Sequence, residues 1–292
     1  MSKLITIFTP TYNRANFLPR LYESLKRQTR KDFVWLVVDD GSIDNTRDLI
    51  KSWMGEHIID IRYIFKENGG KMRAHNVGVQ ECETELFMCL DSDDYLTDCC
   101  VESIYKNWEH HSDNFKVSAM VAYRNMIGMP PSYFPKCEYA TLQHINETYK
   151  GETALSFRTK VLKANLFPEI DGEKFVGEGV VYDKLDSRYV MAVVPEYWIE
   201  CEYQEGGLTD SALRLLMNNP KGWALNAKTK YVYRARTMKE KVRYASTYVC
   251  ASLVAHQSLI NIIKGFPNRA MCLLSFPIGI AQMLKNKSLY KK

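Results

Sequence analysis

The sequence lacks the patterns that mark several large classes of protein. None of its 8 cysteines forms a Cys-x-x-Cys pair and its 6 histidines are scattered, so we expect neither a zinc site nor a disulfide framework, but reduced thiols in a cytoplasmic protein. No basic, apolar leader precedes the first apolar run at Leu4, so we expect no signal peptide. Neither a Gly-x-Gly-x-x-Gly motif nor a P-loop motif occurs, which argues against both of those nucleotide-binding modes.

Acidic residues are nearly missing from one end of the chain. From Lys221 to Lys292 there are 14 Lys and Arg but a single acid, Glu240, which gives a balance of +13. The remaining residues contain 25 basic and 33 acidic side chains, a balance of −8, and the two parts sum to the net charge of +5. A basic segment beside an acidic body predicts an anionic partner, either a membrane surface or a nucleic acid.

Long apolar runs are also absent from this basic segment. Tyr244–Ile263 has no charged residue but contains several polar ones, and Ala270–Leu284 is uncharged over 15 residues but is interrupted by Pro277. Both are poor candidates for crossing a bilayer. Basic residues flank the second stretch, so we expect helices that lie in the interface of an anionic membrane. The alternative is packing against the rest of the chain or in a homodimer.

The first half of the chain alternates short apolar runs with helical patterns. The runs are Leu4–Phe8, Phe33–Val38, Ile61–Phe65, Glu85–Leu90 and Val117–Ala122. The helix candidates are a segment capped by Asn16 with Pro19 in its first turn, then Thr46–Trp53, Gly70–Cys82 and Cys99–His110. This alternation predicts an α/β fold with a mostly parallel sheet and helices on both faces.

The second half is less regular. From about residue 123 to 174 we expect loops, a short helix at Thr159–Ala164 and an edge strand, because prolines interrupt the pattern. We then expect a helix at Glu178–Tyr189, an antiparallel strand within Met191–Tyr203, and helices after Ser211. The sequence therefore predicts a catalytic domain over residues 1–220, divided into halves at 1–115 and 116–220, and a basic helical extension over 221–292.

Polar clusters follow four successive predicted strands. In an open α/β sheet, ligands bind beyond the carboxyl ends of the strands, so these clusters are expected to meet at one edge. They are Thr9–Arg14, Asp39–Ser42, Asn68–Arg73 and Asp91–Asp94. Four such clusters are hard to explain by packing alone, and they predict a ligand site.

The acids of Asp91-Ser92-Asp93-Asp94 repel one another unless a cation shares them. Carboxylate oxygens suit Mn²⁺ or Mg²⁺, ions that also bind phosphates. The alternative is an acidic turn that caps the next helix. Asp39 and Asp40 can accept from a base or ribose, or can form a simple turn. Gly69-Gly70 allows a close backbone approach, and Lys71 and Arg73 can face a diphosphate.

The segments LITIFTPTYNR, VVDDGSIDNT, ENGGKMRAHNVG and FMCLDSDD, in this order and spacing, resemble family 2 glycosyltransferases of the GT-A fold, a Rossmann-like architecture. The resemblance covers about the first 110 residues and implies a site for a nucleotide diphosphate sugar. It would place Tyr12, Arg14 and Asp39 near the base, Asp91 near the ribose, and a Mn²⁺ or Mg²⁺ ion on Asp93. The full set of implied nucleotide-sugar residues is Thr9, Pro10, Tyr12, Arg14, Asp39, Asp40, Asn68, Lys71, Arg73, Asp91 and Ser92.

The later segments FVGEGVVYDKL and YQEGGLT resemble the acceptor half of bacterial members that build surface polysaccharides. This resemblance implies Glu178 as the general base, with Asp183 in reserve, and inversion at the anomeric carbon. An acid favoured by the helix dipole is the plainer interpretation of Glu178. His75 replaces a basic residue of the family motif, and the absence of a Gln-x-x-Arg-Trp motif argues against a processive synthase.

The sequence thus predicts an inverting transferase that moves a sugar, expected to come from a UDP-sugar, to a saccharide or lipid-linked saccharide. The resemblance implies capsule, O-antigen or exopolysaccharide synthesis at the cytoplasmic face of the membrane, without nucleic acid. Two other classes compete. A sugar nucleotidyltransferase needs a glycine-rich pyrophosphate loop near the N-terminus, and Thr9–Arg14 is not one. A non-catalytic nucleotide-sugar-binding scaffold at the membrane would tolerate loss of the acids, which are all present.

Overall fold

The computed structural model describes residues 3–129, 133–202 and 212–290. The chain forms two compact units. One comprises residues 1–166 and 188–203 and contains the sheet, and the other comprises residues 167–187 and 204–292 and is helical. This division differs from the expected boundary at residue 220, because residues 167–187 and the helix that follows residue 211 belong with the C-terminal helices. The expected YQEGGLT segment, residues 203–209, lies outside the described residues.

The described residues form a mixed nine-stranded sheet with the order β3-β2-β1-β4-β8-β6-β9-β5, and β7 pairs with β9. The strands β3, β2, β1 and β4 are mutually parallel, as the alternation of strands and helices predicts. Strand β8 then runs antiparallel to both β4 and β6. The strands are β1 Ile5–Thr11, β2 Phe33–Asp39, β3 Asp60–Phe65, β4 Leu86–Cys89, β5 Tyr95–Leu96, β6 Val117–Met126, β7 Tyr139–Ala140, β8 Thr153–Arg158 and β9 Val190–Cys201.

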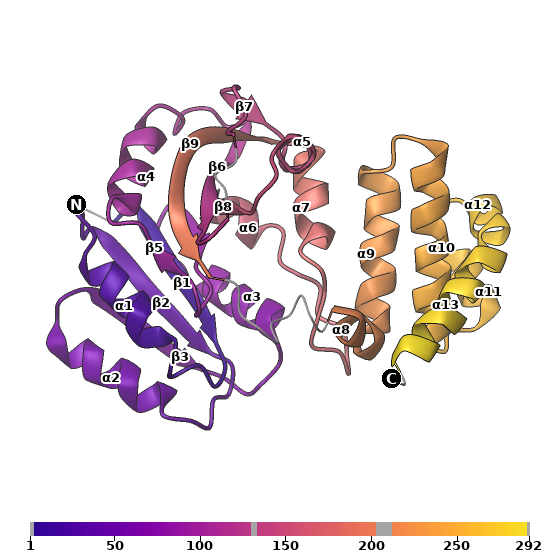
Figure 1. Cartoon of the computed structure of the whole chain (residues 1–292), viewed down its shortest axis with the longest axis horizontal. Coiled ribbons are helices and arrows are strands. Elements are labelled where there is room, and N and C mark those ends of the chain that lie inside the picture. Colours follow the sequence, from indigo (N-terminus) through magenta and orange to yellow (C-terminus); the bar gives the residue numbers. More distant parts are fainter. Residues whose placement is uncertain (1–2, 130–132, 203–211, 291–292) are drawn as a thin grey trace. The chain divides into compact units, whose positions relative to one another are not determined.

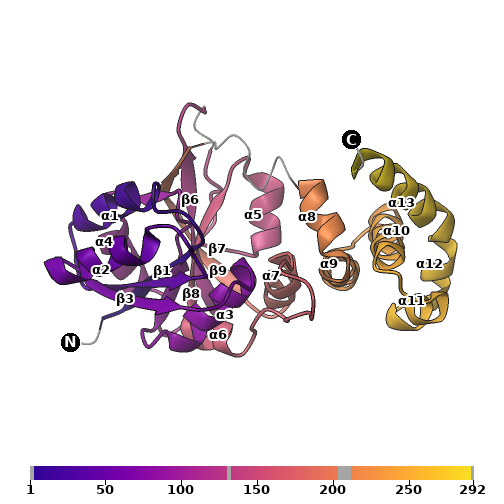
Figure 2. The ribbon, with the colours of Figure 1, turned by 90° about the horizontal axis from the view of Figure 1, so that it is seen from below.

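Helices cover both faces of the sheet in the first unit (Figure 2). Apolar side chains of α1, α2 and α4 pack with Ile5, Trp35 and their neighbours on one face, and α3 and α6 cover the other. The strands are apolar on both sides because both faces are covered. The helices of this unit are α1 Leu18–Lys26, α2 Thr46–Glu56, α3 Lys71–Glu81, α4 Cys100–Glu109, α5 Leu142–Thr148 and α6 Thr159–Lys163.

The edge strand expected between residues 123 and 174 is present as β7, which pairs with β9 alone among the described strands. A second strand of this region, β8, lies inside the sheet between β4 and β6. Two other local expectations were wrong. Strand β9 is antiparallel to β5 and β7, but its long pairing with β6 is parallel. Asn16 does not cap α1, because backbone N–H groups of Phe17 and Leu18 donate to the carbonyl of Arg14, and the helix begins at Leu18.

The second unit consists of helices (Figure 1), and their buried side chains form a small apolar core. Helix α10 packs against α9 on one side and α13 on another. Gly279 of α13 allows the latter contact, since a β-carbon there would lie 2.7 Å from Val249. The helices are α7 Gly179–Asp186, α8 Ala212–Asn218, α9 Pro220–Tyr233, α10 Met238–Val254, α11 Leu259–Gly265, α12 Arg269–Leu274 and α13 Phe276–Tyr290. Among the described helices, none combines the length and apolarity needed to span a bilayer.

Candidate nucleotide-sugar site

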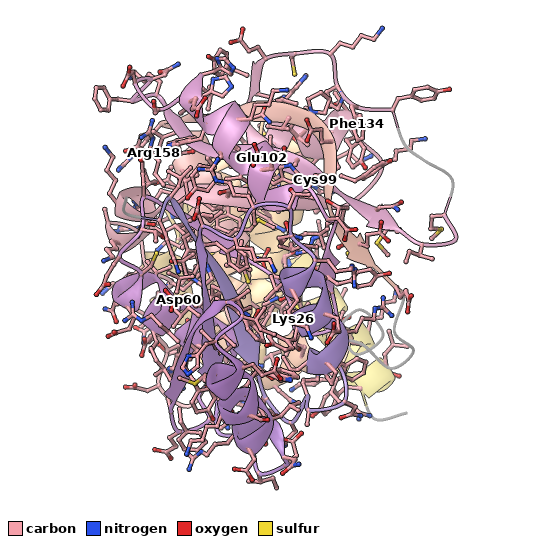
Figure 3. All side chains as sticks on the ribbon, turned by 90° about the vertical axis from the view of Figure 1, so that its left-hand side faces the viewer. Lys26, Asp60, Cys99, Glu102, Phe134 and Arg158 are labelled. Carbon is pink, nitrogen blue, oxygen red and sulfur yellow. The ribbon has the colours of Figure 1, made fainter. Side chains whose placement is uncertain are left out.

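The carboxyl ends of β1, β2 and β4 form one edge of the sheet. Strand β1 lies between β2 and β4 and is parallel to both, so the chain adds strands first on one side of β1 and then on the other. Such a switch point is where open α/β sheets bind ligands. The parallel strands begin at the opposite edge of the sheet, where Asp60 starts β3 and Arg158 ends the antiparallel strand β8. In Figure 3 these two residues lie on the left, and Phe134 lies on the right. We call the carboxyl edge the rim; it comprises residues 10–14, 39–42, 68–73, 91–94 and 124.

Two cations of the protein neutralise the acidic turn after β4. The Nζ of Lys71, at the start of α3, lies 2.6 Å from Oδ1 of Asp91. Arg124, near the end of β6, places Nη2 3.7 Å from Oδ2 of Asp91 and also pairs with Asp94. Ser92, between these acids, is buried. Lys71 and Arg124 therefore relieve the repulsion expected of Asp91 and Asp94, and Arg14 lies near the third carboxylate, Asp93.

The charges of this cluster are set by burial and by the ion pairs together. Burial disfavours an ionised Asp91, but Lys71 and Arg124 outweigh it and lower the pKa of Asp91 to about 2. Burial raises the pKa of Asp94 to about 6, although Arg124 opposes the shift and Asp91 adds to it. Burial also disfavours the Arg124 cation, yet Asp91 and Asp94 raise its pKa. At neutral pH the rim thus holds an ionised Asp91 between two cations.

Asp93 is the carboxylate of the turn that could hold a metal ion. It lies 3.6 Å from Nη1 of Arg14, and both side chains are partly exposed. The described residues contain no cluster of three or more His, Cys, Asp or Glu side chains that could share a metal. A Mn²⁺ or Mg²⁺ ion nevertheless fits the site, because such ions often use one or two carboxylates together with water and substrate phosphates.

Asp39 belongs to the rim by its position in the chain, but its side chain is buried behind the surface of the rim. The carboxylate is fully buried, and both its oxygens are engaged within the protein. Ser42 N–H donates to Oδ1 at 2.8 Å, and the Tyr63 hydroxyl donates to Oδ2 at 2.6 Å. Burial and the bond to Asp39 raise the pKa of Tyr63 to about 12. In this structure the Asp39 side chain has no exposed surface, and its expected contact with a nucleotide base stays a prediction.

Asp40 organises the glycine loop before α3. Its carboxylate accepts from Lys66 Nζ at 2.6 Å, from the N–H of Gly69 at 2.9 Å and from the N–H of Gly70 at 2.7 Å. Asn68 Nδ2 donates to its backbone carbonyl at 2.8 Å. Asp40, buried beneath this loop, and Asn68 thus shape the segment that presents Lys71, and their expected role as sugar-nucleotide ligands stays a prediction.

The end of β1 and the residues that follow it bring both buried and exposed side chains to the region of the rim. Thr9 is fully buried and accepts from Trp35 Nε1 at 3.0 Å, so its hydroxyl faces the core and not the rim. Pro10 is half-buried, whereas Tyr12 is 48% exposed and available for stacking. Asn13 has a φ of 51° and ties this segment to the next one, because its Oδ1 accepts from Ile43 N–H at 2.8 Å.

Helix α3 carries both a rim residue and a core residue. The Nη1 of Arg73 lies 3.3 Å from the carbonyl of Gly69, on the loop side of the helix. His75, which stands where the family motif is basic, is buried edge-on against Phe8 and Phe87, with ring centroids 5.7 and 5.3 Å away. Burial, reinforced by Lys71, lowers the pKa of His75 to about 3. His75 is therefore neutral and adds no charge to the site.

Glu178 and Asp183 belong to the helical unit, whereas the other predicted site residues belong to the sheet unit. Glu178 precedes α7 and is exposed. Asp183 is buried, its Oδ1 lies 3.4 Å from Nε of Arg234, and burial raises its pKa. Of the two acids, Glu178 is the one that solvent and substrate can reach.

The glycines on either side of Glu178 have a packing role. A β-carbon on Gly177 or Gly179 would lie 2.9 or 3.1 Å from the amide of Asn226 in α9. The Gly-Glu-Gly sequence therefore lets this turn lie against α9 and leaves the Glu178 side chain outside the contact.

Arg124, the cation shared by Asp91 and Asp94, is a rim residue that was not predicted from the sequence. Arg124 could have been predicted as a site residue, because it is a basic residue directly after the apolar run that begins at Val117. The four predicted clusters also follow apolar runs. Lys66 was also missed, and its place beside the glycine loop was the available clue. Both pairings join residues about 30 positions apart, which no local pattern encodes.

The family model for "Glycosyl transferase family 2" matches residues 6–166, more than half of the chain. Glycosyltransferase GlyA of Streptococcus pneumoniae serotype 4 is 29% identical over 177 residues, which cover 57% of this chain and 25% of GlyA. Poly(ribitol-phosphate) beta-N-acetylglucosaminyltransferase TarS of Staphylococcus aureus is 28% identical over 170 residues, which cover 56% of this chain and 29% of TarS. The chain thus spans under a third of both relatives.

The fold is similar to a solved structure of the same Staphylococcus aureus protein. The crystal structure of TarS residues 1–349 in complex with UDP-GlcNAc has a TM-score of 0.62 to this chain at 18% sequence identity. The alignment covers 94% of this chain and 89% of that one. The mixed sheet and flanking helices therefore have the GT-A architecture expected from the sequence.

Proposed function

Because the chain belongs to glycosyl transferase family 2, we propose that it transfers a sugar from a nucleotide diphosphate sugar to an acceptor hydroxyl. The observation that carries the proposal is the alternation of charge along the rim. Lys71 and Arg124 hold Asp91 ionised, while Arg14 faces the partly exposed Asp93. A diphosphate needs cations, and a divalent ion needs a carboxylate, so the rim offers both within one edge of the sheet.

The donor is a UDP-sugar in this proposal. The name of the relative TarS, an N-acetylglucosaminyltransferase, supports a donor of this class. Tyr12 would stack on the base, Arg14, Lys71 and Arg73 would face the diphosphate, and Asp91 would accept from the ribose hydroxyls.

A Mn²⁺ or Mg²⁺ ion on Asp93 would supply positive charge beside the departing diphosphate. The chain's own cations act on the same oxygens. Lys71 stands at the start of α3, where the N–H groups of the helix also favour negative charge. Charge that develops on the leaving group is thereby stabilised in advance by fixed donors.

Glu178 would act as the general base. The acceptor hydroxyl loses its proton to the Glu178 carboxylate while its oxygen forms a bond to the anomeric carbon. The bond from that carbon to the β-phosphate oxygen breaks, and the nucleoside diphosphate leaves with the electron pair. Attack opposite to the leaving group inverts the anomeric centre. Asp183 is the poorer candidate, because it is buried and paired with Arg234.

The acceptor in this proposal is a saccharide on a lipid carrier, in the synthesis of a surface polysaccharide such as capsule, O-antigen or exopolysaccharide. Helices α11–α13 would bring the enzyme to the cytoplasmic face of the membrane. They expose large apolar side chains, and Lys264, Arg269, Lys285 and Lys287 lie among them. The exposed set is Leu259, Ile260, Leu273, Leu274, Ile278, Ile280, Leu284, Leu289 and Tyr290. We call this set the apolar face; apolar side chains interleaved with cations match an anionic interface.

Flotation with anionic liposomes tests the membrane proposal. Removal of all residues after Thr237 would also remove α10, which packs against α9, so substitution is the cleaner perturbation. The double variant Leu273→Asp/Leu274→Asp should stay with the soluble fraction while wild type floats at low salt. Val232→Asp is the control and should float, since Val232 is an aliphatic residue of α9 that is 50% exposed, close to the 54% of Leu273. If the double variant floats like wild type but no longer self-associates in solution, the apolar face is a homodimer interface.

Release of nucleoside diphosphate from a panel of nucleotide sugars, with and without Mn²⁺, tests the reaction itself. Metal-stimulated release that increases when saccharides are added supports the transferase. Pyrophosphate formed from a nucleoside triphosphate and a sugar phosphate would indicate a nucleotidyltransferase instead. Tight binding of nucleotide sugars with no release would indicate the non-catalytic scaffold.

A further inference from the structure

A cavity of about 690 Å³ opens next to the rim in the sheet unit. Its lining includes Arg124, Met126, Tyr149, Glu152 and Tyr197. This volume lies within the usual range of small-molecule sites, roughly 300–1,000 Å³. The residues come from the end of β6, from β9 and from the segment that leads into β8, and of these elements the proposed donor site uses only β6, through Arg124.

Arg124 joins this cavity to the rim. Its guanidinium pairs with Asp91 and Asp94, and the same side chain lines the cavity wall. The topology explains the continuity. Strand β6 is parallel to β9 and antiparallel to β8, which is itself antiparallel to β4, so β4, β6 and β9 all end at the carboxyl edge. A molecule in the cavity would therefore lie directly beside the acidic turn.

The walls combine aromatic surfaces with a few polar groups. Phe134 packs against Tyr123, Tyr149 and Tyr197, with ring centroids 4.5, 6.2 and 5.0 Å away. Tyr149 also packs against Tyr123, with ring centroids 4.3 Å apart. This mutual packing holds the aromatic wall in place. Glu152 is exposed at the mouth, and its backbone carbonyl accepts from Arg124 N–H at 2.9 Å.

The chemistry of the walls favours one class of occupant. A pyranose ring has an apolar C–H face that stacks on aromatic rings and a rim of hydroxyls that donate to carboxylates. An acyl chain would cover the Glu152 carboxylate without offering it a hydrogen-bond donor, which is costly. We propose that this cavity binds a pyranose ring of the acceptor, with Tyr197 as the stacking surface and Glu152 as the hydroxyl acceptor. The assignment of this ring as the acceptor rests on the proposed transferase function.

Binding of simple methyl glycosides to the full chain tests the cavity without any turnover. The probes are the methyl pyranosides of glucose, galactose, mannose and N-acetylglucosamine, followed by saturation-transfer NMR. Tyr197→Ala should weaken the best probe about tenfold, the effect of ~1.4 kcal/mol of lost interaction. Tyr197→Phe should bind like wild type, and Glu152→Gln should weaken binding severalfold. Tyr233→Ala, an exposed tyrosine on α9, is the matched control and should have no effect.

Calorimetry with UDP and UDP-GlcNAc on the same variants separates acceptor from donor. Both affinities should stay within about twofold of wild type, since only the cavity is altered. The proposal is overturned if no glycoside binds the wild type, or if Glu152→Gln and Tyr197→Ala bind as well as wild type. It is also overturned if Tyr197→Ala weakens UDP-GlcNAc but not UDP, because the cavity would then hold the donor sugar. Glycoside binding without turnover of any nucleotide sugar would keep the saccharide site and refute the transferase.

Discussion

Removal of the Asp40 carboxylate should cost stability first and nucleotide binding as a consequence. The side chain is only 6% exposed and holds the glycine loop through Lys66, Gly69 and Gly70. The variant Asp40→Ala leaves two backbone N–H groups of that loop without their acceptor. Lys66 also loses its partner, although it is 20% exposed and can be partly rehydrated.

The expected loss is about 3–5 kcal/mol, the usual result of removing one partner of a buried ion pair. Each orphaned N–H alone is worth roughly 1–3 kcal/mol, so the estimate does not require that the hydrogen bonds add independently. For a unit of this size, each kcal/mol shifts the midpoint by about 2–4 °C. Asp40→Ala should therefore lower the Tm by roughly 6–20 °C.

Thermal and urea unfolding, followed by calorimetry with UDP, distinguish the possible roles of Asp40. Asp48→Ala is the control, because it removes the same charge from an exposed position in the first turn of α2, where the expected loss is about 0.3–1 kcal/mol. Because the glycine loop presents Lys71, UDP affinity should also fall in Asp40→Ala. A variant that unfolds at the wild-type midpoint yet fails to bind UDP would refute this reasoning and make Asp40 a direct ligand contact.

Three further outcomes follow from the same geometry. Asp93→Ala should abolish Mn²⁺-dependent nucleotide release with a change in Tm of only a few degrees, because the side chain is partly exposed; wild-type rates in EDTA would exclude a metal. Glu178→Gln should keep donor affinity but cut the rate by roughly 10²–10⁴-fold, and an active Glu178→Gln beside a dead Asp183→Asn would transfer the role to Asp183. The pKa of His75 is about 3 in the folded state, against an ordinary value of 6.5. Between these pH values the unfolded state binds more protons, so the free energy of unfolding should fall as the pH drops below 6.5, by up to about 5 kcal/mol. His75→Phe should flatten this part of the stability–pH curve, and an unchanged slope in chemical unfolding would show that His75 is not its source.

The sequence predicted the first half of the fold well because the signals there are local. Each buried strand is a short apolar run, and each helix between strands has its own amphipathic face, so β1–β4 and α1–α4 appear within a few residues of their expected bounds. The second half was less predictable. No local pattern shows that β8 is inserted between β4 and β6, because this position is decided by pairing with residues about 35 and 70 positions away.

The sequence by itself determined that Thr9–Arg14, Asp39–Ser42, Asn68–Arg73 and Asp91–Asp94 would reach one edge, because parallel strands that alternate with helices all point the same way. It could not determine which of these side chains face a ligand. Tertiary packing buried Asp39 and Asp40 as supports, left Asp93 accessible, and paired Asp183 with Arg234. It also brought Arg124 from a distant strand to Asp91, since burial and charge pairing depend on neighbours in space and not on neighbours along the chain.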